Sequence, residues 1–247
     1  ELFPERVLLG VGIVTALMLG NLRGVRESGT IFMTPTYLYI GAIGSMLVIG
    51  IVRLAAGDLP EFTPPTAWLA GEGGEGGAPE ALGILLVLRA FSSGAAALTG
   101  VEAISDGVPA FKPPEWRNAR ITLVWATVLF ASLFLGISFL AASTAIVPDP
   151  TEEQTVLSIL ARLVIGDGAF FILIQVATVL VLALAANTAF ADFPRLSSFL
   201  ARDSYMPRQF AFRGDRLAFT SGVLILSVVA VALLLGFGGE THALIPL

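Results

Sequence analysis

RAFSSGAAALTGVEAISDGVPAFKPPE, residues Arg89–Glu115, is the stretch that decides the fold. It opens with small and apolar residues, as a membrane helix does, and then gathers hydroxyls, carboxylates and glycine at Thr99, Gly100, Glu102, Ser105 and Asp106. A carboxylate at the bilayer midplane costs about 2.5–3.5 kcal/mol on insertion scales, so Glu102 indicates function. Glycine weakens the helix here, which favours an unwound turn that offers carbonyl oxygens to an ion or solute. The alternative is a satisfied polar pair inside a helix bundle.

Composition places the whole chain in a membrane. Of its 247 residues, 13% are charged and 55% hydrophobic, and the mean hydropathy is +0.85. Soluble domains carry about 25% charged residues. Because the apolar runs are long and continuous rather than alternating, we expect an all-α integral membrane protein rather than a β-barrel.

The same composition argues against catalysis. The chain has no cysteine and a single histidine, His242, which excludes thiol chemistry and the usual spacings of zinc and haem ligands. It also has neither an HExxH nor a GxSxG pattern. We therefore expect no enzyme, no catalytic residue and no cofactor.

Six segments are long and apolar enough to cross a bilayer core of about 30 Å, in one transmembrane domain over residues 1–247. They are residues 7–20, 31–54, 82–111, 121–147, 168–191 and 217–237, the third being the interrupted helix. The chain lacks an initial methionine and stops within an apolar run, so we expect a piece of a longer protein.

Charge sets the orientation of these segments. The first, third and fifth connections hold ten of the fourteen lysines and arginines: Arg23, Arg26, Lys112, Arg117, Arg120, Arg195, Arg202, Arg208, Arg213 and Arg216. Basic connections face the cytoplasm, and six crossings then leave both ends of this sequence outside. Arginine beside membrane spans is ordinary topology chemistry, so we expect no nucleic-acid partner.

Three connections have further character. The glycine-rich run at residues 71–77 is too polar to fold alone, and we expect it to be mobile. Residues 148–166 predict a short helix on the outer face, with Glu152 and Glu153 in its first turn. Residues 193–216 alternate arginine with apolar residues, which predicts an interfacial amphipathic helix, and Asp192 is expected to pair with Arg195.

Thr99 and Glu102 are three residues apart and so share a helix face. Hydroxyl, carbonyl and carboxylate oxygens form a hard ligand set that suits a dehydrated alkali cation. Glu102 can also take up a proton, since burial favours the neutral carboxyl. The exchange of cation for proton is a physical basis for coupled transport.

Other polar residues are candidates for the cavity or a gate. Asp106 either gates the inner half of the helix or is a solvated carboxylate at its end. Ser92 and Ser93 either line the outer mouth or bond back to the preceding turn. Asn187 and Thr188 either add oxygens to the cavity or join helices by hydrogen bonds.

Three motifs together resemble the APC superfamily of permeases. NLRGVRESG at residues 21–29 is similar to the loop after the fourth core helix, and ALTGVEAIS at residues 97–105 to the broken sixth helix. Pro113, Pro114, Glu115 and Asn118 to Arg120 follow that helix as in the superfamily. ARDSYMP at residues 201–207 is similar to ARDGxxP after the eighth helix, with Ser204 in place of glycine. TGVEAIS and NTAFADFPRL at residues 187–196 look most like KimA-type potassium importers of the KUP branch.

The resemblance implies a partial LeuT-like inverted-repeat transporter core, with these segments as core helices four to nine. It implies that Thr99 and Glu102 bind potassium, with Glu102 tied to proton coupling, in a multi-pass protein of a prokaryotic cell membrane. It further implies partner ligands on the first and third core helices, a homodimer, and a cyclic di-AMP-sensing C-terminal region, the helices and that region lying outside this sequence. Potassium and protons would be transported species rather than cofactors.

Three functions stay open at this point. The first is proton-coupled potassium uptake by alternating access. The second is an APC-type permease for an amino acid or other small organic solute, which requires an apolar pocket and free helix N-termini. The third is a channel-like or non-transporting membrane subunit, which would tolerate the loss of Thr99 and Glu102.

Overall fold

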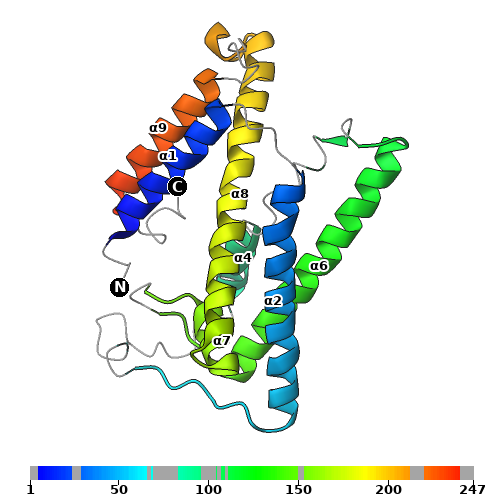
Figure 1. Cartoon of the computed structure of the whole chain (residues 1–247), viewed down its shortest axis with the longest axis vertical. Helices are drawn as coiled ribbons and strands as arrows, with labels where there is room; N and C mark the ends of the chain where they lie inside the picture. Colours follow the sequence, from blue (N-terminus) through cyan, green and yellow to red (C-terminus); the bar gives the residue numbers. More distant parts are fainter. Residues whose placement is uncertain are drawn as a thin grey trace. The chain divides into compact units, whose positions relative to one another are not determined.

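The computed structural model describes residues 5–23, 29–65, 68, 83–95, 104, 107–108, 111–149, 153–211 and 220–239, and side chains for most of them. Its regular elements there are helices (Figure 1). They are α1 (Arg6–Leu22), α2 (Gly29–Ala55), α4 (Ile84–Ala95), α6 (Glu115–Ser143), α7 (Val156–Ile165), α8 (Ala169–Arg202), the short 3₁₀ helix η4 (Arg208–Ala211) and α9 (Thr220–Gly236).

Three of these helices are long and apolar enough to cross a membrane: Met33–Ala55 within α2, all of α6 and all of α8. Three shorter helices, α1, α7 and α9, are also apolar. The protein is therefore an all-α membrane protein. The predicted segment at residues 82–111 is described mainly by α4, since residues 96–103, 105–106 and 109–110 lie outside the described part.

Helix bounds agree within three residues of the predictions for α1, α2 and α9, and differ for two others. Helix α8 continues to Arg202 through Pro194, so the predicted end of the fifth segment at residue 191 is wrong, and residues 193–202 are helical as part of α8. A proline removes one backbone donor, and the turns on either side can keep the helix going. Helix α6 begins at Glu115 rather than residue 121, so Arg117 and Arg120 lie in its first two turns.

The chain divides into two compact units, residues 1–42 with 172–247, and residues 43–171. In the first unit α1 and α9 lie side by side and antiparallel (Figure 1). A Cβ on Gly10 would lie 3.3 Å from Leu234, and one on Gly239 would lie 3.6 Å from Val7. Helix α9 also contacts α8 closely, since a Cβ on Gly222 would come within 2.8 Å of the Pro194 backbone.

In the second unit the core forms where α2, α6 and α7 meet. Ile43, Met46, Leu140 and Leu160 are fully buried there. Glycine allows these helices to approach: a Cβ on Gly50 would lie 2.6 Å from Leu140, and one on Gly136 would lie 2.8 Å from Leu47. Small residues at crossings of this kind are the usual basis of helix packing in membranes.

Helix α7 confirms the short helix predicted after residue 148, with a different first turn. The helix begins at Val156, and its N-cap is Thr155, whose hydroxyl accepts a hydrogen bond from the Ser158 amide at 3.2 Å. Glu153 therefore precedes the helix instead of lying in its first turn. The threonine hydroxyl accepts a hydrogen bond from a first-turn amide that would otherwise lack a partner.

The other end of α7 is held by Arg53 from α2. One guanidinium nitrogen of Arg53 donates to the carbonyl of Val164 at 2.6 Å and to that of Leu163 at 3.4 Å. The same side chain contacts Asp58, with Nε 3.3 Å from the carboxylate. Since the last carbonyls of a helix have no partners within it, Arg53 serves as a C-terminal cap for α7.

Helices α2, α6 and α8 end in one geometry, with a left-handed residue after the last turn. These residues are Gly57 (φ 71°), Ala145 (φ 53°) and Ser204 (φ 68°). At α8 the Ser204 amide donates to Ala201 at 3.3 Å and the Tyr205 amide to Leu200 at 2.8 Å. This pair of bonds defines the Schellman motif, whose left-handed position favours glycine. The motif gives a physical reason for the glycine in ARDGxxP, where this chain has Ser204.

Candidate functional site

The central part of the candidate site lies outside the described residues. Thr99, Gly100, Glu102, Ser105 and Asp106 are all in that group, and the cation site predicted on them stays a prediction. The glycine-rich run at residues 71–77, predicted to be mobile, is also outside the described part.

Helix α4 leads into this stretch. Its described side chains are exposed and mostly apolar, with Leu85 at 79% and Phe91 at 77% exposure. Ser92 is exposed on the same helix, and the side chain of Ser93 lies outside the described part. Within the stretch Ile104 is half-buried, and so are Gly107 and Val108 directly after it. The lining of an outer mouth by these serines stays a prediction.

Asn187 is the candidate that the structure places most fully. Its Oδ1 accepts a hydrogen bond at 2.8 Å from Nδ2 of Asn21, on the last turn of α1. The second hydrogen of the Asn21 amide goes to the Leu17 carbonyl at 2.9 Å. Both side chains are half-buried. An amide nitrogen has two N–H donors, so both donors of the Asn21 side chain are used, and the bond joins α1 to α8. This is the helix–helix alternative weighed for Asn187.

Thr188, the neighbour of Asn187, is used within its own helix. Its hydroxyl donates to the Leu184 carbonyl at 3.3 Å, and the side chain is exposed. The same bond to the preceding turn occurs at Thr15, Thr127, Ser132 and Thr178. A hydroxyl that donates to the carbonyl four residues earlier has its hydrogen bond within its own helix, so it needs no partner on a neighbouring helix.

Sequence reasoning missed Asn21 as a partner. Asn21 stands at the end of an apolar run, where a lone amide signals a polar contact, but its partner lies 166 residues away. The ion pair predicted between Asp192 and Arg195 is confirmed, with Arg195 Nη1 3.8 Å from Asp192 Oδ1. At that distance between partly exposed groups it contributes little stability.

The described residues hold no second site of obvious chemistry. Every buried side-chain nitrogen or oxygen in that part of the chain has a hydrogen-bond partner. No group of three or more His, Cys, Asp or Glu that could hold a metal occurs among the same residues. Two surface pockets lie in the second unit. One, of about 260 Å³, is lined by Phe62, Trp68 and the α7 side chains around Arg162. The other, of about 390 Å³, lies on the first part of α6.

The sequence matches the amino acid permease family over residues 3–245, almost its whole length. The chain is also 43% identical, over all of its 247 residues, to the potassium transporter KimA of Bacillus subtilis (strain 168). It spans 39% of the length of that relative. Both the family and the relative are transporters rather than enzymes. The helical, apolar chain described above therefore belongs to the amino acid permease family.

Proposed function

We propose that the protein containing this chain is a secondary transporter that imports potassium together with protons by alternating access. The observation that carries the proposal is the 43% identity to a potassium transporter across every residue of this chain. The sequence of the interrupted segment agrees with it, because Thr99 and Glu102 supply the hard oxygen ligands that an alkali cation requires.

In this proposal Thr99 and the carbonyls around Gly100 bind the cation, and Glu102 alternates between a cation-bound carboxylate and a protonated carboxyl. Ser105 adds a further oxygen, and Asp106 acts at the inner gate. Burial in a membrane makes an uncompensated carboxylate costly, so Glu102 would hold either a cation or a proton at each stage of the cycle. The bond between Asn21 and Asn187 would keep α1 and α8 together during that cycle.

The test is rubidium uptake into proteoliposomes that contain the full-length protein, driven by an imposed proton gradient. Glu102→Gln should abolish uptake, and Thr99→Ala should weaken it mainly by raising the KM for rubidium. Glu153→Gln is the matched control, because Glu153 is an exposed carboxylate ahead of α7 and outside the candidate site. Uptake by Glu102→Gln at the wild-type rate would rule out the role assigned to Glu102.

A second candidate function is transport of an amino acid, which the match of residues 3–245 to the amino acid permease family favours. The two candidates differ in what competes with rubidium. A potassium site should be blocked by potassium and unaffected by a mixture of the common amino acids. Accumulation of a labelled amino acid, with no rubidium uptake, would favour the second function.

A further inference from the structure

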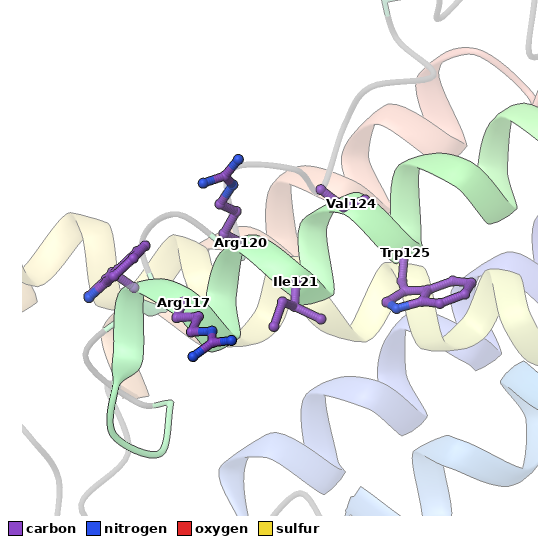
Figure 2. Close-up of a pocket in the computed structure, with 6 residues that line it drawn as sticks. Arg117, Arg120, Ile121, Val124 and Trp125 are labelled. Carbon is purple, nitrogen blue, oxygen red and sulfur yellow. The ribbon is translucent and has the colours of Figure 1, made fainter.

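The pocket on α6 combines positive charge with an apolar surface. It has a volume of about 390 Å³ and is lined by Trp116, Arg117, Arg120, Ile121, Val124 and Trp125. These residues form two adjacent rows at four-residue spacing, so each row lies along one stripe of the helix. Figure 2 shows Arg117 and Arg120 leaving α6 on different sides, with Trp125 further along the helix.

The positive charge at this pocket is not neutralised within the described part of the chain. Arg117 and Arg120 are exposed, and the ion pairs found among the described residues involve other arginines. Glu115 is the single acidic residue between residues 111 and 143, against Lys112, Arg117 and Arg120. Two guanidinium groups that are free to turn can converge on a phosphate, which they bind by paired hydrogen bonds.

The charged and apolar parts of the pocket lie at different positions along α6. At about 1.5 Å per residue, Trp125 lies roughly 8 Å beyond Arg120 toward the middle of the helix. Ile121 and Val124 lie between them. Trp116 and Trp125 are 65% and 64% exposed, and tryptophan is enriched where a membrane meets water. The ligand that fits is therefore amphiphilic, with an anionic head at the arginines and a tail beside Trp125.

The segment before α6 is fixed against its first turn. The Asn118 side chain donates to the Lys112 carbonyl at 2.8 Å, and Ala119 is buried. The backbone at Lys112 is thus tied to the first turn of α6. The predicted orientation puts this end of α6 at the cytoplasmic leaflet, whose anionic lipids attract basic groups near the surface.

We propose that this pocket, on residues 116–125 of α6, binds an anionic phospholipid of the cytoplasmic leaflet. The phosphate lies between Arg117 and Arg120, and an acyl chain runs along Ile121, Val124 and Trp125. The proposal stands on the pocket and its charges, and it does not depend on which solute the protein transports.

The experiment is native mass spectrometry of the full-length protein in detergent, titrated with phosphatidylglycerol or phosphatidylcholine of the same chain length. Each basic group near a membrane surface contributes about 1 kcal/mol. Arg117→Gln with Arg120→Gln should therefore weaken the tightest phosphatidylglycerol site roughly 10- to 30-fold, which corresponds to about 1.4–2 kcal/mol. Phosphatidylcholine binding should not change.

Two further variants make the result specific. Arg202→Gln with Arg208→Gln removes the same charge from exposed arginines elsewhere on the predicted cytoplasmic side, and should leave the tight site intact. Trp125→Ala keeps every charge, and should still weaken phosphatidylglycerol binding because the tail loses its apolar contact. Since all these side chains are exposed, size-exclusion profiles should match the wild type.

Several outcomes would overturn the proposal. The first is equal loss in both arginine pairs, which would reduce the effect to net charge. The second is unchanged phosphatidylglycerol binding in Arg117→Gln/Arg120→Gln, as expected if another part of the protein covers the pocket. The third is displacement of the lipid by millimolar inorganic phosphate with no effect of Trp125→Ala, which would indicate a site for free phosphate.

Discussion

The left-handed residue that follows α2 allows a prediction about stability. Replacing glycine by alanine should lower the stability of the protein at that residue and raise it inside the helix. Gly57 follows α2 with φ 71°, and a Cβ there would meet no atom within 4 Å. Gly44 lies inside the same helix, and a Cβ there would also meet nothing within 4 Å. Packing is therefore equal at the two sites, and only the backbone conformation differs.

The magnitude follows from two opposing terms. A left-handed backbone costs an L-residue about 1–2 kcal/mol, which Gly57→Ala would introduce. Alanine also lowers the conformational entropy of the unfolded chain, which stabilises the folded protein by about 0.4–1 kcal/mol. Gly57→Ala should therefore destabilise by about 0.5–1 kcal/mol. Gly44→Ala should stabilise by about 0.5–1 kcal/mol, because glycine in a helix interior is unfavourable by that amount.

At Ala145 the native chain has alanine where the backbone favours glycine, so the opposite substitution can be tested there. It occupies the left-handed position after α6 with φ 53°, and the next amide, that of Ile146, donates to the Ala141 carbonyl at 3.0 Å. Ala145→Gly should therefore stabilise the protein by about 0.5–1 kcal/mol, as the steric cost is removed. Ser204→Gly should act in the same direction at the end of α8.

The assay is thermal unfolding of the full-length protein in one detergent, followed by circular dichroism. A change of 1 kcal/mol shifts Tm by about 2 °C or somewhat more in chains of 150–250 residues, and by less in larger ones. Gly57→Ala should lower Tm, while Gly44→Ala and Ala145→Gly should raise it. If Gly57→Ala raised Tm as Gly44→Ala does, the reasoning from backbone conformation would be refuted.

Two further predictions concern contacts between helices. A double-mutant cycle of Asn21→Ala and Asn187→Ala should give a coupling free energy of about 0.6 kcal/mol and at most about 1.7 kcal/mol, measured by unfolding in mixed micelles; additive effects would show that the bond is not formed in the membrane. Arg53→Gln should destabilise by about 1–2 kcal/mol, since it leaves the α7 carbonyls of Leu163 and Val164 without their donor. Arg162→Gln should cost about 1 kcal/mol or less, because its ion pair with Asp167, its hydrogen bond to Gln154 and its contact with the Phe171 ring are formed by a partly exposed side chain; the reverse order would contradict the capping role.

Much of the fold could be predicted because it depends on local chemistry. Long apolar runs place α1, α2, α6, α8 and α9, and a period of apolar residues after Thr155 places α7. The ends of the helices are less predictable. The fifth apolar segment is predicted to end at residue 191, yet α8 continues to Arg202, because a helix can extend past its apolar part and, with Pro194 inside it, be continued by the turns on either side.

For the candidate site, the sequence predicts residue types but not their partners. The cost of a carboxylate inside a membrane makes Glu102 a candidate whatever surrounds it, since that cost is a property of the side chain and the solvent. The contact between Asn21 and Asn187 could not be predicted, because hydrogen bonding of an amide is satisfied equally well by its own helix, by another helix or by a solute.

The sequence by itself determined that this is a helical membrane protein of the permease type, because hydropathy, charge and motif are carried by residues taken in order along the chain. Only the tertiary structure decided that α1 is joined to α8, that Arg53 caps α7, and that Arg117, Arg120 and Trp125 line one pocket. These features depend on helix bounds and on pairs of residues brought together through space, and neither is recorded in local composition.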